Sequence, residues 1–497
     1  MRTTRPAVDT GWGPTRAEIR RAGRLVSTLS LQQLAGQVIV AQYAGQAAPA
    51  GLVNGLHLGG VITFDENIAT TDQLRTTNES LQASADQAGR RWPVFIGVDQ
   101  EGGIVERVKG RATRFPTFMS AGAAADRALT RRATAASGAE LKNLGFTAVF
   151  APDADVTSGP DDPTIGSRSA GSRPHAVAAQ VNAAADGFLS AGILPVVKHF
   201  PGHGSVPADS HVELPVQTKS LPELTRSDLV PFDSAVSAGV ASVMVAHIDV
   251  RAVDPGRPAT LSRAVVTGLL RDRLGFDGLV VTDALDMAAV TQRHDSASSA
   301  VLALRAGNDV LLMPPDPGAA RAGIVAAVRS GRLAKSRLTQ AATRQVAVLL
   351  HQRALEPSLE RAPGTSAKEF RRLSAAAVST LSGPCAGRLV GSSVQVFGPS
   401  AAVATFESAA SRAGLRTGSG STVALVGYGG AAASADVVVS LDTPYVLGAS
   451  TAEVAKIAVY GDTPGAMDAL VGVLLGTARA PGEVPVDVAG VERAGCR

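Results

Sequence analysis

Cysteines, aromatic residues and long apolar runs are all scarce in this sequence of 497 residues. The two cysteines, Cys385 and Cys496, are too few for a disulfide framework and wrongly spaced for a zinc site, and they leave the redox compartment open. Aromatic residues make up 4%, charged residues 18% and hydrophobic residues 45%, which excludes disordered and collagen-like proteins. Every apolar stretch falls short of the roughly 18 residues that a membrane-spanning helix requires.

Clusters of basic residues are also missing. The formal net charge is +4 and the arginines are scattered, so the sequence lacks the electrostatic signature of a nucleic-acid-binding protein. Residues 1–27 contain arginines throughout and no apolar run that could form the core of a signal peptide. We therefore expect a cytoplasmic protein without a nucleic-acid partner. Export of a chain whose signal has been trimmed is the alternative.

Short apolar segments rich in β-branched residues recur along the first part of the chain, and Ala/Leu-rich helical segments lie between them. The predicted strands are 37–43, 59–64, 93–98, 146–152, 194–200, 241–247, 277–283 and 308–314. The predicted helices are 70–88, 120–144, 174–191, 222–238, 262–274 and 286–306, whereas the first connection, 44–58, is Gly-rich. Alternating strands and helices imply parallel pairing, and eight such units predict a (β/α)8 TIM-like barrel. A doubly wound open sheet is the alternative.

The texture of the sequence changes after residue 350. We predict a barrel domain over 1–355, a linker over 356–370 that mixes charge, Pro and Gly, and a second domain over 371–497. The second domain has predicted strands at 393–398, 422–427, 436–441 and 456–461, and predicted helices at 401–413 and 464–475. This pattern indicates a smaller α/β domain, similar to an αβα sandwich.

Polar side chains follow the predicted strands at their carboxyl ends, where the active site of such a barrel forms. They are Asp99, Glu101, Asp153, Asp155, Arg168, Lys198, His199, His203, His247, Asp283 and Asp286. A single Asp after a strand is most often a helix cap, and the segment PGHG alone would be a turn. Lys198, however, ends an apolar strand, where an ammonium is costly without a partner. The presence of these polar groups at several strand ends together therefore predicts a functional site.

Three kinds of chemistry could use these groups. A metal site would use His199, His203, His211 and Asp209, but the spacing H-x3-H-x7-H matches no helical zinc signature. Phosphate binding is the second possibility, but the segment GHGSVP lacks the Lys-Ser/Thr ending of a phosphate-binding loop. The third is nucleophilic displacement, in which a carboxylate attacks carbon and a His beside an Asp transfers the proton. Asp209 and His211 are two residues apart, so in an extended loop they can face the same side.

Four motifs resemble those of glycoside hydrolase family 3, and specifically its β-N-acetylhexosaminidase branch. They are KHFPGHG with DSH (198–211), VDQEGG (98–103), TIGSRSAG (164–171) and VVTDALDM (280–287). The segments YGDTPGAMDALVGVLLG and APGEVPVDV near the C-terminus resemble those of the family's two-domain members. The resemblance thus covers the whole barrel and extends into the second domain.

The resemblance implies a role for each matching residue. Asp283 matches the nucleophile that forms a covalent glycosyl-enzyme, and His211 matches the acid/base, paired with Asp209. The residues that match those around the terminal sugar are Asp99, Arg168, Lys198 and His199, with His203 in the mobile catalytic loop and His247 near the sugar pocket. Asp286 is a rival nucleophile in principle, but its position favours capping of the next helix.

Two positions depart from the family pattern: Ile104 stands where Arg is common, and Ala170 where Phe is common. Both affect the expected rim of the pocket. Because the dyad lies within the barrel, the second domain need not supply a catalytic group, and packing, stability or partial cover of the cleft is its expected role.

The predicted activity is that of a retaining exo-β-N-acetylglucosaminidase acting on peptidoglycan fragments or chitooligosaccharides, as a monomer or homodimer, without a metal or organic cofactor. The alternatives are a phosphorylase that passes the sugar to phosphate, a broader β-glucosidase, a metal-dependent hydrolase and a catalytically silent sugar-binding protein.

Overall fold

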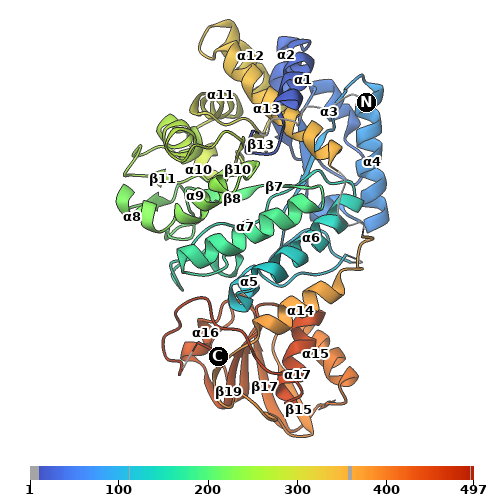
Figure 1. Cartoon of the computed structure of the whole chain (residues 1–497), viewed down its shortest axis with the longest axis vertical. Coiled ribbons are helices and arrows are strands. Elements are labelled where there is room, and N and C mark those ends of the chain that lie inside the picture. The colour runs from blue at the N-terminus through green and yellow to red at the C-terminus, as the bar shows by residue number, and fades with distance from the viewer. Residues whose placement is uncertain (1–9, 111, 356–360, 493, 497) are drawn as a thin grey trace, which may run out of the picture.

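The eight strands predicted before residue 320 all form in the computed structural model, which describes residues 10–110, 112–355, 361–492 and 494–496. Six strands pair in the order β13-β1-β2-β3-β6-β7 and three in the order β12-β10-β8. The predicted strand 194–200 is divided at Val196 into β7 and β8, and a bridge between Val281 and Val310 joins β12 to the region of β13. The strands therefore close into the predicted barrel, which forms the larger, upper part of the molecule in Figure 1, above the second domain.

The barrel strands are short, and each is buried along its whole length. Their bounds are β1 (Ile39–Ala41), β2 (Gly60–Thr63), β3 (Phe95–Val98), β6 (Ala148–Val149), β7 (Leu194–Pro195), β8 (Val197–Phe200), β10 (Ser242–Val245), β12 (Leu279–Thr282) and β13 (Leu311–Leu312). Parallel strands in a barrel are covered on both faces, which explains why continuous apolar runs signalled them. Two shorter pairs lie outside the ring: the antiparallel hairpin β4 (Gln100–Gly102) and β5 (Val105–Glu106), and the parallel pair β9 (Val216–Gln217) and β11 (Asp249–Val250).

The helices that surround the barrel include all the predicted ones, but three of these are divided. The bounds are α1 (Arg16–Ser27), α2 (Leu31–Gln37), α3 (Ala50–Leu56), α4 (Thr71–Gln87), α5 (Met119–Ala124), α6 (Arg127–Asn143), α7 (Pro174–Ser190), α8 (Leu221–Arg226), α9 (Val230–Ser237), a π-helix (Ala264–Arg273), α10 (Ala288–Thr291), α11 (Ser296–Ala306), α12 (Pro317–Arg329) and α13 (Lys335–Ala354). The predicted helix 120–144 breaks at Ala125, which has a positive φ of 51°, and Asp126 then caps α6. The predicted helix 286–306 breaks before Asp295, whose side chain caps α11.

The second domain is an open sheet in the order β14-β19-β18-β17-β15-β16, with β14 antiparallel to β19 and the other pairs parallel. Its elements are α14 (Ala367–Ala377), β14 (Ser379–Ser382), β15 (Ser393–Phe397), α15 (Ser400–Arg412), β16 (Arg416–Thr417), β17 (Ser421–Val426), β18 (Ser434–Ser440), α16 (Val446–Ala449), β19 (Thr451–Ala458) and α17 (Pro464–Leu474). Residues 356–360 of the predicted linker lie outside the described residues, and its last residues, 367–370, begin α14.

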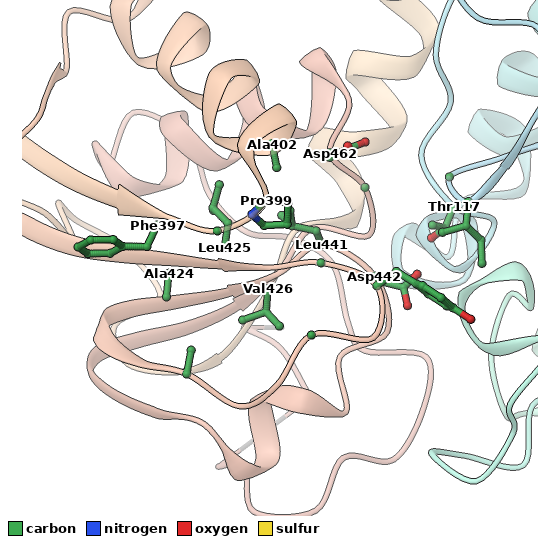
Figure 2. Close-up of a pocket in the computed structure, with 18 of the residues that line it drawn as sticks. Thr117, Phe397, Pro399, Ala402, Ala424, Leu425, Val426, Leu441, Asp442 and Asp462 are labelled. Carbon is green, nitrogen blue, oxygen red and sulfur yellow. The ribbon is translucent and has the colours of Figure 1, made fainter.

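Apolar side chains from both domains form one of the buried clusters. Phe115 and Met119 of the barrel region meet Phe370, Leu373 and Tyr460 of the second domain. A cavity of about 560 Å³ lies beside this contact, at the carboxyl ends of β15, β17 and β18 (Figure 2). The second domain is thus packed against the barrel through a shared core.

A disulfide joins Cys385 to Cys496 and encloses most of the second domain in one covalent loop. Two cysteines make no disulfide framework, and this single bond was not predicted from the sequence. Among the helices that the structure describes, none has both the length and the apolar character needed to cross a bilayer.

Candidate active site

A cavity of about 280 Å³ opens at the carboxyl ends of the barrel strands, near the lower end of the size range of small-molecule sites. Seven of the nine predicted site residues line it: Asp99, Arg168, Lys198, His199, His203, His211 and Asp283. The cavity also has an apolar part formed by Ile62, Met244, Met287 and Leu312. This mixture of converging polar groups and apolar surface is typical of a site for one small ligand.

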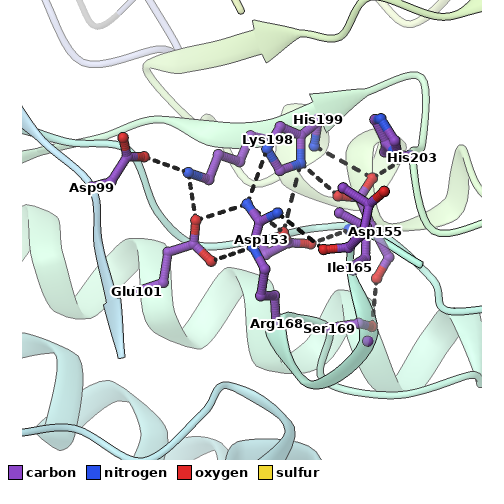
Figure 3. Close-up of polar contacts among 12 residues, drawn as sticks. Asp99, Glu101, Asp153, Asp155, Ile165, Arg168, Ser169, Lys198, His199 and His203 are labelled. Carbon is purple, nitrogen blue, oxygen red and sulfur yellow. Dashed lines mark hydrogen bonds and ion pairs between the residues drawn. The ribbon is translucent and has the colours of Figure 1, made fainter. Parts of the chain in front are cut away.

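Glu101 is the centre of a buried network of charges (Figure 3). Its Oε1 atom lies 2.6 Å from Lys198 Nζ, and its two oxygens accept from the guanidinium of Arg168 at 2.8 and 2.9 Å. Lys198 Nζ also donates to Asp99 Oδ1 at 2.7 Å. Burial raises the pKa of Glu101, but Arg168 and Lys198 outweigh this effect and lower it to about 2. Burial likewise lowers the pKa of Lys198, but Asp99 and Glu101 raise it above its ordinary value. The ammonium that looked costly in the sequence therefore has two carboxylate partners.

A second group of buried side chains holds the imidazole of His199. Asp155 Oδ2 lies 2.7 Å from His199 Nδ1, and Asp155 Oδ1 accepts from the backbone N–H of His203. On the other side of the ring, His199 Nε2 lies 3.2 Å from Arg168 Nη2. Asp153 lies beneath this pair, and burial together with the neighbouring Asp155 raises its pKa well above the ordinary value. These contacts fix the orientation of His199 toward the cavity.

Asp283 directly follows β12, so its carboxylate lies at the open end of the barrel. Its Oδ1 atom accepts from the N–H of Ala284 at 2.8 Å. Burial raises the pKa of Asp283, but the imidazole of His199, the Ala284 N–H and the Lys198 ammonium outweigh this effect, and the pKa lies below its ordinary value. The surroundings of Asp283 therefore favour its ionised carboxylate.

His247 lies below the cavity and does not line it. The ring is fully buried, with Nε2 2.8 Å from the carbonyl oxygen of Ala284 and Nδ1 2.6 Å from the hydroxyl of Thr260. Burial lowers the pKa of His247, so the neutral ring donates from Nε2 and accepts at Nδ1. The predicted contact with the sugar pocket is thus replaced by support of the backbone next to Asp283.

Asp209 and His211 form the predicted dyad on the loop that follows β8. Asp209 Oδ1 lies 2.7 Å from His211 Nδ1 and accepts from the backbone N–H of His211 at 2.9 Å. His211 also lines the cavity. The same loop is attached to the floor of the site because His203 Nε2 lies 3.0 Å from the hydroxyl of Ser210. Burial lowers the pKa of His203 to about 4, so this imidazole is neutral near pH 7.

Asp286 lies in the turn before α10 and lines the cavity instead of capping the helix, because α10 has no side-chain cap. Burial raises the pKa of Asp286, and the charge of Asp283 acts in the same direction. The expectation that Asp286 is a cap is therefore wrong. Of the two carboxyl groups, Asp283 is the one whose surroundings stabilise the charged form.

The four residues weighed as metal ligands in the sequence do not form a ligand set among the described residues. A different group, Asp153, Asp155 and His199, has ligand atoms within 4.8 Å of one another. The carboxylate oxygens of this group already accept from the His203 N–H and face His199 Nδ1, and the Arg168 guanidinium lies 3.6 Å from Asp153 Oδ2. A cation there would meet the positive charge of Arg168, so these side chains fit a hydrogen-bonded network better than a metal site.

Glu101, Asp153 and Asp155 lie at the predicted strand ends, but the sequence indicated no role for them. Their partners come from other strands, and only the closed barrel brings them together. The signal that could have identified them is the presence of Lys198 and Arg168 in the same set of strand ends, since two buried cations require ionised partners.

Comparison with known proteins gives a consistent result. The chain is 37% identical over 279 residues to β-hexosaminidase A of Pseudoalteromonas piscicida, a match that covers 53% of this chain and only 47% of that protein. It is 35% identical over 291 residues to β-hexosaminidase LpqI of Mycobacterium tuberculosis, covering 57% of this chain and 73% of that protein. The chain thus spans about half the length of the first relative and about three quarters of the second.

The solved structure of a glycoside hydrolase family 3 β-N-acetylglucosaminidase from Paenibacillus sp. str. FPU-7 is similar over both domains. The TM-score is 0.84 at 29% identity, and the superposition covers 93% of this chain and 99% of the other. The family model for the N-terminal domain of glycosyl hydrolase family 3 matches residues 30–348, which include every side chain of the cavity described above. The chain therefore belongs to glycosyl hydrolase family 3.

Proposed function

We propose that the chain is a retaining exo-β-N-acetylglucosaminidase. The observation that supports this most directly is that Asp283 and His211 line one cavity at the mouth of the barrel. Its volume of about 280 Å³ fits a terminal sugar, not an internal segment of a chain. The similarity to the β-hexosaminidases and to the Paenibacillus enzyme supports the same activity.

In the first step, Asp283 attacks the anomeric carbon and the bond to the leaving group breaks. The electrostatic surroundings of Asp283 support this role because they keep its carboxylate ionised. His211 donates a proton from Nε2 to the departing oxygen. Asp209 meanwhile accepts a hydrogen bond from Nδ1 of the same ring and holds the ring in place. The product of this step is a glycosyl ester of Asp283.

In the second step, the neutral His211 removes a proton from a water molecule that attacks the same carbon. Two inversions at one carbon give overall retention of configuration. A His/Asp dyad thus takes the place of the second carboxylate that most retaining glycosidases use. Asp99, Arg168, Lys198 and His199 would bind the hydroxyl groups of the sugar, since all four line the cavity.

The substrates that we propose are N-acetylglucosaminyl-anhydromuramyl peptides from the cell wall, or chitooligosaccharides. Transfer of the sugar to phosphate is a second candidate. It is favoured by the dyad, because an imidazole at the mouth of the site repels an incoming phosphate less than a carboxylate would. The two reactions differ in their second step only.

A panel of aryl and alkyl β-N-acetylglucosaminides, with and without phosphate, tests this function. Replacing Asp283 by Asn should abolish turnover and preserve ligand binding. Replacing His211 by Ala should slow alkyl glycosides, which have poor leaving groups, about 100-fold more than activated aryl glycosides. Acceleration by phosphate with release of a 1-phosphate would identify a phosphorylase. Loss of activity with a chelator would favour the metal-dependent alternative instead.

We propose that the chain acts in an oxidising compartment, in contrast to the cytoplasmic location expected from the sequence. The Cys385–Cys496 disulfide supports this, because such bonds are rare in reducing compartments. Counting free thiols in the protein purified without a reductant, from its natural source, tests the location: two reactive thiols would favour the cytoplasm. We further propose a barrel domain of 1–355, a second domain that begins with α14 at Ala367 instead of the predicted residue 371, and a monomer or homodimer.

A further inference from the structure

Asp442 of the second domain contacts the active-site side of the barrel. It lies two residues after β18, with 8% of its surface exposed, and it accepts a hydrogen bond from the hydroxyl of Ser167, which is 1% exposed. Figure 2 shows Asp442 on the side of the interdomain cavity where Thr117 of the barrel lies. The bond therefore joins two buried residues that are 275 positions apart in the chain.

Ser167 is the middle residue of a 3-10 turn, Gly166–Arg168, so it is the direct neighbour of Arg168. The two side chains point in different directions. That of Ser167 reaches the second domain, whereas that of Arg168 lines the catalytic cavity and contacts Glu101 and His199. A shift of the turn would therefore move the guanidinium within the site.

The loop before this turn has hydrogen bonds of its own. Asp162 accepts from the backbone N–H groups of Thr164, Ile165 and Gly166. After Arg168, the N–H of Ser172 donates to the carbonyl oxygen of Pro485 in the second domain at 3.1 Å. The segment around Arg168 is thus held by the second domain on both sides, and Asp442 makes the nearer of these two contacts.

We infer that Asp442 is a positioning residue of the active site, which holds Arg168 in place through Ser167. This inference rests on the proposed function, in which Arg168 binds the terminal sugar. The second domain would then contribute to sugar binding without placing any group in the cavity. Loss of the carboxylate leaves a buried hydroxyl unpaired and frees the turn to move.

The test compares four variants by steady-state kinetics on an aryl β-N-acetylglucosaminide. Asp442→Ala and Ser167→Ala should each raise KM about tenfold with kcat changed less than about twofold, because a sugar contact made equally in ground and transition states affects KM. The double variant should be no worse than Asp442→Ala alone, since both remove one bond. Asp442→Asn should restore KM to within about twofold because its amide oxygen can still accept the bond.

Asp436→Ala is the matched control. Asp436 is a carboxylate within β18, the strand that precedes Asp442. It accepts from the backbone N–H of Thr422 at 2.7 Å within the second domain, and it makes no hydrogen bond to the barrel among the contacts of the described residues. Its replacement should weaken the second domain and leave KM unchanged. Hydrogen exchange of the amides at 162–172 should accelerate in Asp442→Ala and not in Asp436→Ala.

Two outcomes would overturn the inference. One is an unchanged KM and unchanged exchange at 162–172 in Asp442→Ala. The other is a fall in kcat at constant KM, because that is the result of losing folded enzyme, which is a purely structural effect. If the wild type has no N-acetylglucosaminidase activity, the proposed function fails, and the exchange measurement alone still decides whether Asp442 holds the turn.

Discussion

Replacing Glu101 by Gln should destabilise the barrel and weaken substrate binding at the same time. Both carboxylate oxygens are used: they face Lys198 Nζ at 2.6 Å and the Arg168 guanidinium at 2.8 and 2.9 Å. A glutamine can accept through its oxygen only, and its amide N–H group would face a cation that also donates. The substitution therefore leaves one buried cation with a repulsive neighbour.

The size of the effect can be worked out in two ways. Removing one partner of a buried ion pair costs about 3–5 kcal/mol, and the lower end applies because Asp99 and Asp153 remain near the two cations. Independently, the pKa of Glu101 is lowered from 4.5 to about 2, a difference worth about 3 kcal/mol. Because the folded-state pKa is the lower one, this stability is complete above pH 4.5 and is lost as the pH falls toward 2. We expect a loss of about 3 kcal/mol at pH 7.

Urea unfolding at pH 7 measures the free energy, and steady-state kinetics measure KM. The matched control is Asp309→Asn, because Asp309 is a buried carboxylate that accepts from Arg271 at 2.6 Å and Arg337 at 2.8 Å at the opposite end of the barrel. The control should lose stability and keep its KM, whereas Glu101→Gln should lose stability and raise KM. An unfolding midpoint of Glu101→Gln equal to that of the wild type would refute the reasoning.

Three further predictions concern the dyad, the disulfide and acid stability. Asp209→Ala should reduce kcat on alkyl glycosides about tenfold more than on aryl glycosides, because it releases the ring of His211; equal losses in the leaving-group series would argue against the dyad. Replacing both Cys385 and Cys496 by Ser should lower the free energy of unfolding by about 2–4 kcal/mol, measured with urea, and an unchanged midpoint would count against it. His203 has a pKa of about 4 in the folded protein and an ordinary value of 6.5. Its neutral ring therefore contributes fully to the free energy of unfolding above pH 6.5, and this contribution declines by about 3 kcal/mol as the pH falls to 4. Unfolding free energies that stay flat between pH 7 and pH 4 would be inconsistent with this.

The barrel could be predicted because its strands are buried on both faces, which leaves continuous apolar runs in the sequence. Several site residues could be predicted because they lie at the ends of these strands. Asp283 follows β12 directly, and Lys198 and His199 belong to β8. The breaks within helices were missed because each depends on a local cap, such as Asp126 or Asp295, inside a segment of uniform helical composition.

The residues that act at a distance along the chain could not be predicted. Glu101 acquires its role from Lys198 and Arg168, which lie on other strand ends, and Asp442 contacts a turn 275 residues away. The family resemblance implied that His247 lies near the sugar pocket, but its ring is buried against Ala284. Sequence position shows at which end of the barrel a side chain lies, and only tertiary packing shows which way it faces.

The dyad and the base of the cavity differ in their exposure to solvent. The side chain of His211 is 65% exposed and that of Asp209 is 38% exposed, whereas Lys198 and Glu101 at the base of the cavity are 3% exposed. The imidazole can therefore exchange its proton directly with bulk water between turnovers, without a relay of internal groups. Proton supply would then depend on the buffer, while the sugar and its ester with Asp283 stay in the shielded part of the barrel.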